Sequence, residues 1–130
     1  MNILLGIGGT NDSFTALERV VERTAETGDE LVVAVIDNLE TDVDPSELEE
    51  RAREAVADAG LAVADDPSEG VVIRHVEGHP GPRLVEIADQ ENFDRIALGG
   101  GQRSPMGKIA IGEVAEFVLL NARTTVTLVR

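Results

Sequence analysis

The chain has 130 residues, 42% of them apolar, and its 25 acidic and 11 basic side chains give a formal charge of −14. This length suits one hydrophobic core, so we expect a single domain over residues 1–130. The absence of cysteine excludes disulfides, thiolate metal sites and cysteine nucleophiles. The negative charge argues against a nucleic-acid partner, because lysine and arginine are the residues that neutralise phosphates.

Lysine is almost absent from the chain, since Lys108 is the only one among the 11 basic residues. A carboxylate-rich composition without lysine is typical of a halophilic protein from a high-salt cytoplasm, where salt screens self-repulsion. The longest unbroken apolar run, residues 31–36, is too short to span a membrane, and no signal-peptide pattern is present at residue 1. We therefore expect a soluble, cytoplasmic protein without a membrane partner.

Short apolar runs alternate with segments of helical periodicity along the whole chain. In chain order we expect strand 3–7, a helix capped at Asp12 or Ser13, strand 31–36, helix 45–60, strand 71–76, a helix after Pro80, strand 96–98, helix 111–121 and strand 125–129. Gly28 and Gly60 are typical helix C-caps, and Asp44 followed by proline and Glu47 is typical of a helix start. Arg74 and His75 interrupt the third strand, which favours a sheet edge.

This alternation predicts an α/β fold with an open five-stranded parallel sheet in the order 3-2-1-4-5 and helices on both faces, a Rossmann-like arrangement. The polar third and fifth strands take the edges in this order. Ligands of such sheets bind beyond the carboxyl ends of the strands, where the winding direction reverses. That crevice should lie between residues 8–10 and residues 99–101, both of which are rich in glycine.

Other kinds of site have weak support in the sequence. Gly6-Ile7-Gly8 begins like a dinucleotide-binding fingerprint, but Asn11 stands where the third glycine would be. The acidic residues and lysine of a phosphoacceptor receiver domain are missing from the strand ends. His75 and His79 have only Glu77 nearby as a further metal ligand, and no Ser-His-Asp spacing stands out, so we expect neither a metal site nor a catalytic triad.

Five segments, in this order and spacing, resemble the universal stress protein family over nearly the whole chain. They are ILLGIGGT at 3–10, VVAVID at 32–37, EGHPGPRLVEIA at 77–88, DRIALG at 94–99 and GEVAEFVLLNARTTVTLV at 112–129. The resemblance implies the five-stranded fold described above, which is similar to that of adenine-nucleotide hydrolases. It also implies a homodimer joined through the last strand, Thr125–Val129.

Nucleotide-binding members of this family have a loop of the form G-x2-G-x9-G-[ST] and an aspartate after the first strand that contacts adenine. The outer glycines of the loop match Gly99 and Gly112 here. Three positions depart from the pattern, because Gln102, Glu113 and Gly8 replace a glycine, a hydroxyl residue and the aspartate. The remaining residues that the resemblance assigns to the site are Gly9, Val35, Leu98, Arg103 and Val114.

The departures at 102 and 113 change what the expected site can bind. A side chain at Gln102 obstructs the close backbone approach that glycine permits. Two like charges about 4 Å apart repel by about 4 kcal/mol at an effective dielectric of about 20, against about 1 kcal/mol for a lost hydrogen bond. We therefore hypothesise that Glu113 fills the helix-terminal anion site with its own carboxylate.

Two functions remain open at this point. The first is a non-catalytic stress-response or regulatory homodimer that acts through protein partners and needs no cofactor. The alternative is an ATP- or AMP-binding universal stress protein with slow hydrolysis, in which Glu113 holds Mg²⁺ that bridges the phosphates. No catalytic residue can be named for this hydrolysis, since the chain has only two histidines and no evident base.

Overall fold

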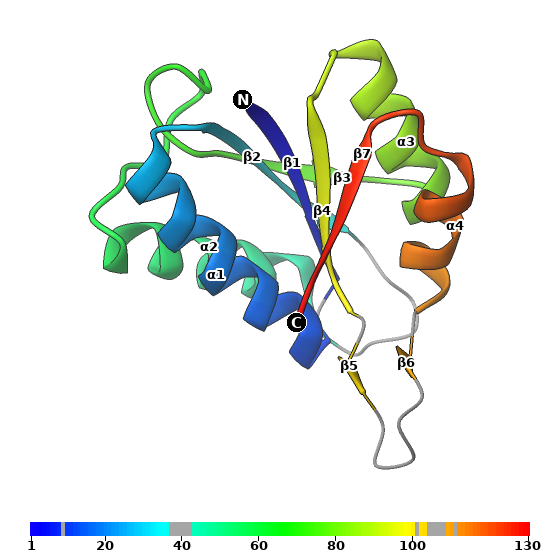
Figure 1. Cartoon of the computed structure of the whole chain (residues 1–130). Helices are drawn as coiled ribbons and strands as arrows, with labels where there is room; N and C mark the ends of the chain where they lie inside the picture. Colours follow the sequence, from blue (N-terminus) through cyan, green and yellow to red (C-terminus); the bar gives the residue numbers. More distant parts are fainter. Residues whose placement is uncertain (9, 37–42, 101, 104–108, 111) are drawn as a thin grey trace.

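The computed structural model of the chain describes residues 1–8, 10–36, 43–100, 102–103, 109–110 and 112–130. Five parallel strands form one sheet in the order β3-β2-β1-β4-β7 (Figure 1). These strands are β1 (Asn2–Ile7), β2 (Glu30–Ile36), β3 (Val72–Val76), β4 (Arg95–Gly99) and β7 (Thr125–Val129). The helices are α1 (Asn11–Thr27), α2 (Pro45–Asp58), α3 (Pro80–Gln90) and α4 (Glu113–Asn121). The predicted α/β fold and strand order are therefore confirmed.

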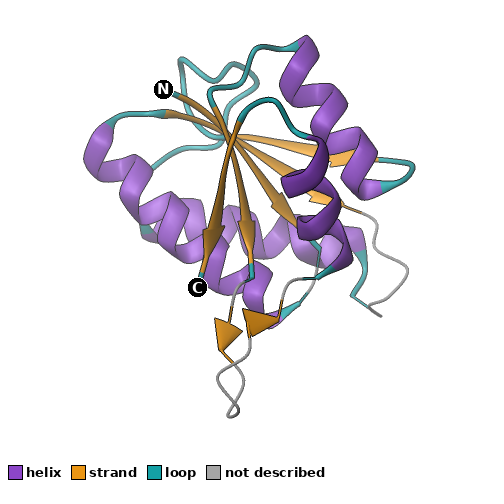
Figure 2. Ribbon diagram, turned by 45° about the vertical axis from the view of Figure 1, so that its right-hand side comes forward, coloured by secondary structure: helices purple, strands orange, loops and turns teal. Residues whose placement is uncertain are grey.

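The side chains of the central strands alternate between the two faces of the sheet, and each face builds its own hydrophobic cluster. Leu5 belongs to the cluster that includes residues of α1 and α2, whereas Leu4 belongs to the cluster that includes residues of α3 and α4. Both leucines are fully buried, which stabilises the fold by about 1.5–3 kcal/mol for each side chain. Figure 2 shows the two pairs of helices on opposite faces of the sheet.

Polar residues mark β3 as an edge strand, as predicted. Nη1 of Arg74 donates to both carboxylate oxygens of Glu91, at 2.7 and 2.8 Å, and Nε2 of His75 lies 3.3 Å from Oε1 of Glu49. β7 is the strand at the opposite edge of the sheet. These two strands tolerate polar residues because one side of each is open.

The first two helices start with side-chain caps, one of which was predicted wrongly. Thr10, rather than Asp12 or Ser13, is the N-cap of α1, and its hydroxyl accepts from the amide of Ser13 at 3.1 Å. Asp44 caps α2 as predicted and accepts from the amide of Ser46 at 2.9 Å. Each cap satisfies an amide that the helix itself leaves without a partner.

The helix before the last strand differs from its prediction. α4 begins at Glu113, and Ile111 lies outside the described residues. Helical spacing in the sequence predicts that Ala115, Val118 and Leu119 share one buried stripe. Ala115 and Val118 are buried, but Leu119 is 41% exposed. The segment is apolar on nearly all sides, so its sequence does not reveal which side faces the sheet. Phe117 and Leu120 are also exposed.

The glycine-rich segment between β4 and α4, expected to be a loop, contains a short antiparallel ribbon. Its strands are β5 (Gln102–Arg103) and β6 (Ile109–Ala110), and they pair Gln102 with Ala110 and Arg103 with Ile109. In Figure 2 the ribbon extends beyond the arrowheads of the main sheet. It therefore belongs to the end of the fold where the crevice is expected.

In the part of the chain that the structure describes, no helix combines the length and apolar character that crossing a membrane requires.

Candidate functional site

A cavity of about 120 Å³ lies at the carboxyl ends of β1 and β4. We call it the switch-point cavity, because β1 has β2 on one side and β4 on the other, and the winding direction reverses there. It is lined by the end of β1 with the first turn of α1, by the end of β4, and by the start of α4. The crevice predicted from the sequence is present at this point.

Most of the predicted site residues that the structure describes line this cavity. They are Gly8, Leu98, Gly99, Gly112, Glu113 and Val114. Val35 is 1% exposed and belongs to the cluster on the α1–α2 face, whereas the next residue, Ile36, faces the other way and lines the cavity. Gly9 and the side chains of Gln102 and Arg103 lie outside the described part of the structure.

The first turn of α1 supplies two cavity residues that the sequence did not indicate, Asp12 and Ser13. Thr10, which belongs to the predicted crevice segment 8–10, also lines the cavity. The hydroxyl of Ser13, a residue that is 8% exposed, accepts from the amide of Gly8 at 3.1 Å and lies 3.1 Å from the hydroxyl of Thr10. These bonds hold the turn after β1 against the helix that follows it.

The two outer glycines of the loop pattern have different structural roles. A Cβ atom on Gly99 would overlap the backbone carbonyl of Asp12 and lie 2.8 Å from the amide nitrogen of Ser13. Gly99 is therefore needed for packing between β4 and α1. A Cβ atom on Gly112 would meet nothing within 4 Å, and its φ of −68° suits any residue. Neither packing nor backbone conformation therefore requires glycine at position 112, which lines the cavity.

Gly6, the start of the apparent dinucleotide fingerprint, also has a packing role. It lies inside β1, and a Cβ atom there would come within 2.9 Å of Leu98 and 3.0 Å of Leu84. The glycine lets the side chains of the α3 face close over the strand. It does not form the turn that a dinucleotide fingerprint requires.

The charged side chains among the described residues of the switch-point cavity are both acidic. Asp12 is partly exposed and Glu113 exposed, and neither carboxylate has a hydrogen bond or ion pair within the described residues. Within the described residues, the carboxylate of Glu113 therefore does not accept the hydrogen bond from the backbone amides at the start of α4 that we hypothesised. No lysine or arginine is among the described residues that line the cavity. A phosphate there would meet two carboxylates and, from these residues, no cation.

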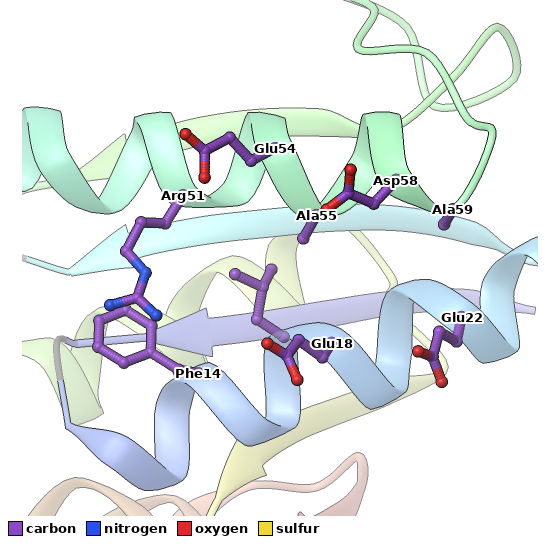
Figure 3. A pocket seen from close by; sticks show the side chains of 9 residues that line it. Phe14, Glu18, Glu22, Arg51, Glu54, Ala55, Asp58 and Ala59 are labelled. Atoms are coloured by element: carbon purple, nitrogen blue, oxygen red, sulfur yellow. The ribbon is translucent and has the colours of Figure 1, made fainter.

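A larger cavity of about 240 Å³ lies between α1 and α2, away from the strand ends (Figure 3). The guanidinium of Arg51 stacks 3.5 Å above the ring of Phe14. Four carboxylates line the same cavity: Glu18, Glu22, Glu54 and Asp58. Like-charge repulsion makes it unsuitable for an anionic nucleotide. Neither these carboxylates nor any other three described His, Asp or Glu side chains are grouped so that they could hold a metal ion.

A family model with the description "Universal stress protein family" matches residues 1–130. The chain belongs to the universal stress protein family. A curated universal stress protein from Methanothermobacter thermautotrophicus is 34% identical over 86 residues, which are 65% of this chain and 58% of that protein. The match thus spans somewhat more than half of that relative's length.

Solved universal stress proteins share the fold of this chain. One, crystallised in complex with cAMP, is 26% identical with a TM-score of 0.70, over 100% of this chain and 96% of the other. The universal stress protein from Archaeoglobus fulgidus is 22% identical with a TM-score of 0.69, over 100% and 98% of the two chains. At this lower identity the second likeness concerns the fold alone.

Proposed function

We propose that this universal stress protein is a non-catalytic stress-response homodimer whose switch-point cavity binds ATP or AMP weakly or not at all. One observation carries the proposal: Asp12 and Glu113 line the cavity, and no basic side chain is among the described lining residues. Charge repulsion of this kind opposes phosphate groups. The cavity volume of about 120 Å³ is also below the roughly 300–1,000 Å³ of most ligand pockets.

The second candidate, an ATP- or AMP-binding protein, has support of its own. A solved relative at 26% identity was crystallised with cAMP, and Gly112, the N-cap of α4, lines the cavity and has open space where a side chain would be. Helix starts favour anions. Asp12 and Glu113 would in this case hold Mg²⁺, since carboxylate oxygens are ligands that Mg²⁺ prefers, and the metal would bridge the phosphates.

Calorimetric titration with ATP separates these two candidates. The wild-type protein is compared with the Gln102→Gly/Glu113→Ser variant, with and without Mg²⁺, in about 0.1 M KCl, where the Debye length of about 10 Å leaves the charge of Glu113 only partly screened. The proposal expects the variant to bind ATP about tenfold more tightly than the wild type, with no requirement for Mg²⁺. Glu116→Ser removes the same charge from the first turn of α4 outside the cavity and should leave binding unchanged.

Two results would contradict the proposal. Wild-type protein that binds ATP tightly only with Mg²⁺, and loses this binding in Glu113→Ser, would favour the metal-bridged site. Tight binding by the wild type without Mg²⁺ would show that the two carboxylates do not repel the nucleotide. If the wild type binds ATP only with Mg²⁺, slow release of phosphate from the bound ATP would also identify the protein as an enzyme.

The homodimer proposed through Thr125–Val129 rests on the open edge of β7. The amide of Gly100 donates to the carbonyl of Val129 at 3.1 Å, so the polar backbone groups of Val129 point toward β4. Because these groups alternate in direction along a strand, those of Val126 and Leu128 point toward the open edge. A second β7 can pair there about a twofold axis. Val126→Pro removes one edge amide, and sedimentation velocity should then detect more monomer.

A further inference from the structure

A separate cavity of about 230 Å³ lies between α1 and the half of the sheet formed by β4 and β7. It shares no lining residue with the switch-point cavity. Three arginines line it, Arg19 and Arg23 from α1 and Arg95 from the start of β4, and we call it the arginine cavity. In a chain with 25 acidic and 11 basic residues, this gathering of guanidinium groups at one cavity requires an explanation.

The three arginines have no direct partner in the part of the chain that the structure describes. No hydrogen bond or ion pair joins any of them to another described residue. Other arginines of the same chain are paired with glutamates 2.7–3.7 Å away, as in Arg53 with Glu49 and Arg74 with Glu91. Asp29, a carboxylate of the same lining, lies near enough to Arg23 for the arginine to lower its pKa. One carboxylate offsets only part of the three positive charges, so an anion placed between the arginines would relieve the remaining repulsion.

Arg95 gives the second observation. Its Nε atom is buried and has no hydrogen-bond partner among the described residues. A buried N–H group without an acceptor is unfavourable, and native structures rarely leave one in that condition. Arg95 also lines the cavity, so an oxyanion there can accept from the Nη–H groups of its guanidinium, whose fork of donors suits a phosphate.

The rest of the lining indicates the size and character of the ligand. Ile3, Val20, Ala97 and Val129 give an apolar wall, and Thr24 and Thr127 belong to the same lining. The volume of about 230 Å³ lies below the roughly 300–1,000 Å³ of pockets for larger ligands, which argues against a whole nucleotide. The one carboxylate of the lining, Asp29, already accepts from the hydroxyl of Thr27 at 2.8 Å and lies 3.3 Å from the Met1 amino group.

We propose that the arginine cavity binds the phosphate group of a small organic molecule. Arg19, Arg23 and Arg95 hold the phosphate, which carries nearly two negative charges at neutral pH, and the apolar wall contacts the organic part. This site is independent of the switch-point cavity and of the function proposed for it. The protein thereby accepts phosphate at a place where its fold provides arginines, although its overall charge is strongly negative.

Titration at constant ionic strength with two probes, inorganic phosphate and glycerol 3-phosphate, tests the proposal. Arg95→Gln should weaken binding of both probes about tenfold, as expected for loss of a charge-assisted hydrogen bond. Arg53→Gln removes the same charge from α2 at a residue that does not line the cavity and should change binding less than twofold. Amide NMR shifts caused by glycerol 3-phosphate should gather at Ala97 and Thr127 and not at Gly112.

Because Arg95 is partly buried, its substitution could also disturb folding. The Arg19→Gln/Arg23→Gln variant changes only exposed side chains and provides a second test, with the same expected loss of about tenfold. Circular dichroism verifies the fold of each variant. A third variant, Arg95→Lys, keeps the charge but lacks the fork of donors, and should recover only part of the affinity.

Three results would overturn the proposal. Phosphate affinity that falls equally in Arg95→Gln and Arg53→Gln would reflect the net charge only. Shifts that gather at Gly112 and Glu113 would place phosphate at the switch-point cavity. No saturable phosphate binding by the wild type, together with a change of sedimentation coefficient in Arg95→Gln, would show that the arginines serve carboxylates of a second copy.

Discussion

The described residues that line the switch-point cavity and those that line the arginine cavity carry opposite charges. The first has Asp12 and Glu113 in its lining, and the second has Arg19, Arg23 and Arg95. An α/β fold determines where an opening at the strand ends will lie, but the side chains around it determine which charge it accepts. In this chain the described residues of that opening carry two carboxylates and no basic side chain, and the arginines gather elsewhere, beside α1 and the edge strand.

The largest expected effect concerns the packing that shapes the switch-point cavity. Gly99→Ala places a Cβ atom against the backbone of Asp12, and this overlap should reduce the free energy of unfolding by about 3 kcal/mol. Gly112→Ser is the matched control at the other end of the loop pattern. Its Cβ atom enters open space, and its hydroxyl can cap α4, so the free energy of unfolding should stay the same or rise slightly.

Urea denaturation followed by circular dichroism measures both variants. Equal losses of stability would show that Gly112 is also needed for packing. A small effect in Gly99→Ala would instead mean that the first turn of α1 moves away from β4 easily. Asp12 would then not be held in the cavity, and its repulsion of phosphate would be weaker.

The next effect tests whether charge alone distinguishes the two cavities. Glu113→Arg replaces a carboxylate with a guanidinium at the start of α4, and it should raise the affinity of the switch-point cavity for inorganic phosphate by about tenfold. Amide shifts should then include Gly112. Glu116→Arg makes the same charge change in the same helical turn without lining the cavity. An equal gain in both variants would mean that net charge, and not the cavity, sets the affinity.

A smaller effect follows from the different exposure of the two charged groups. Glu113 is exposed, whereas Nε of Arg95 is buried. Raising KCl from about 0.1 M to about 1 M shortens the Debye length from about 10 Å to about 3 Å. The difference in ATP affinity between Glu113→Ser and the wild type should therefore nearly vanish. The difference in phosphate affinity between Arg95→Gln and the wild type should decrease only about twofold. Equal decreases of the two affinity differences would show that salt screens Glu113 and Arg95 to the same extent.

The fold was largely predictable because its main signal is local. The apolar runs of β1 and β2 and the polar residues of β3 were sufficient to place these strands in the sheet. The cap of α1 was ambiguous, since Thr10, Asn11, Asp12 and Ser13 are all residue types that favour this position. The orientation of Leu119 was wrong because α4 is apolar on nearly every side.

The site was only partly predictable, because its remaining features depend on contacts between distant segments. The loop pattern gave Gly99, Gly112 and Glu113, but no local pattern showed that Asp12 would face them across the cavity. The arginine cavity depends even more on contacts between segments that are distant in the sequence. It combines residues of α1, β4 and β7, and in the sequence Arg95 reads only as the polar start of a buried strand.

The smallest expected effect is a pH dependence at the rim of the arginine cavity. A hydrogen bond from Thr27, together with the nearby Met1 amino group and Arg23, holds the pKa of Asp29 below its usual range. Because the pKa is lower in the folded state, the carboxylate stabilises the protein at pH values above the usual aspartate pKa of about 3.9. This stabilisation is lost as the pH falls through the folded-state value.

Asp29→Asn should therefore lower Tm slightly at pH 7, and the difference from the wild type should disappear as the pH falls through the lowered pKa of Asp29. Asp58→Asn removes a carboxylate from the cavity between α1 and α2 and serves as the control. Loss of the Asp29 charge should also raise the affinity of the arginine cavity for phosphate about twofold at pH 7. Unchanged or weaker phosphate binding in this variant would mean that Asp29 orients the arginines instead of opposing the anion.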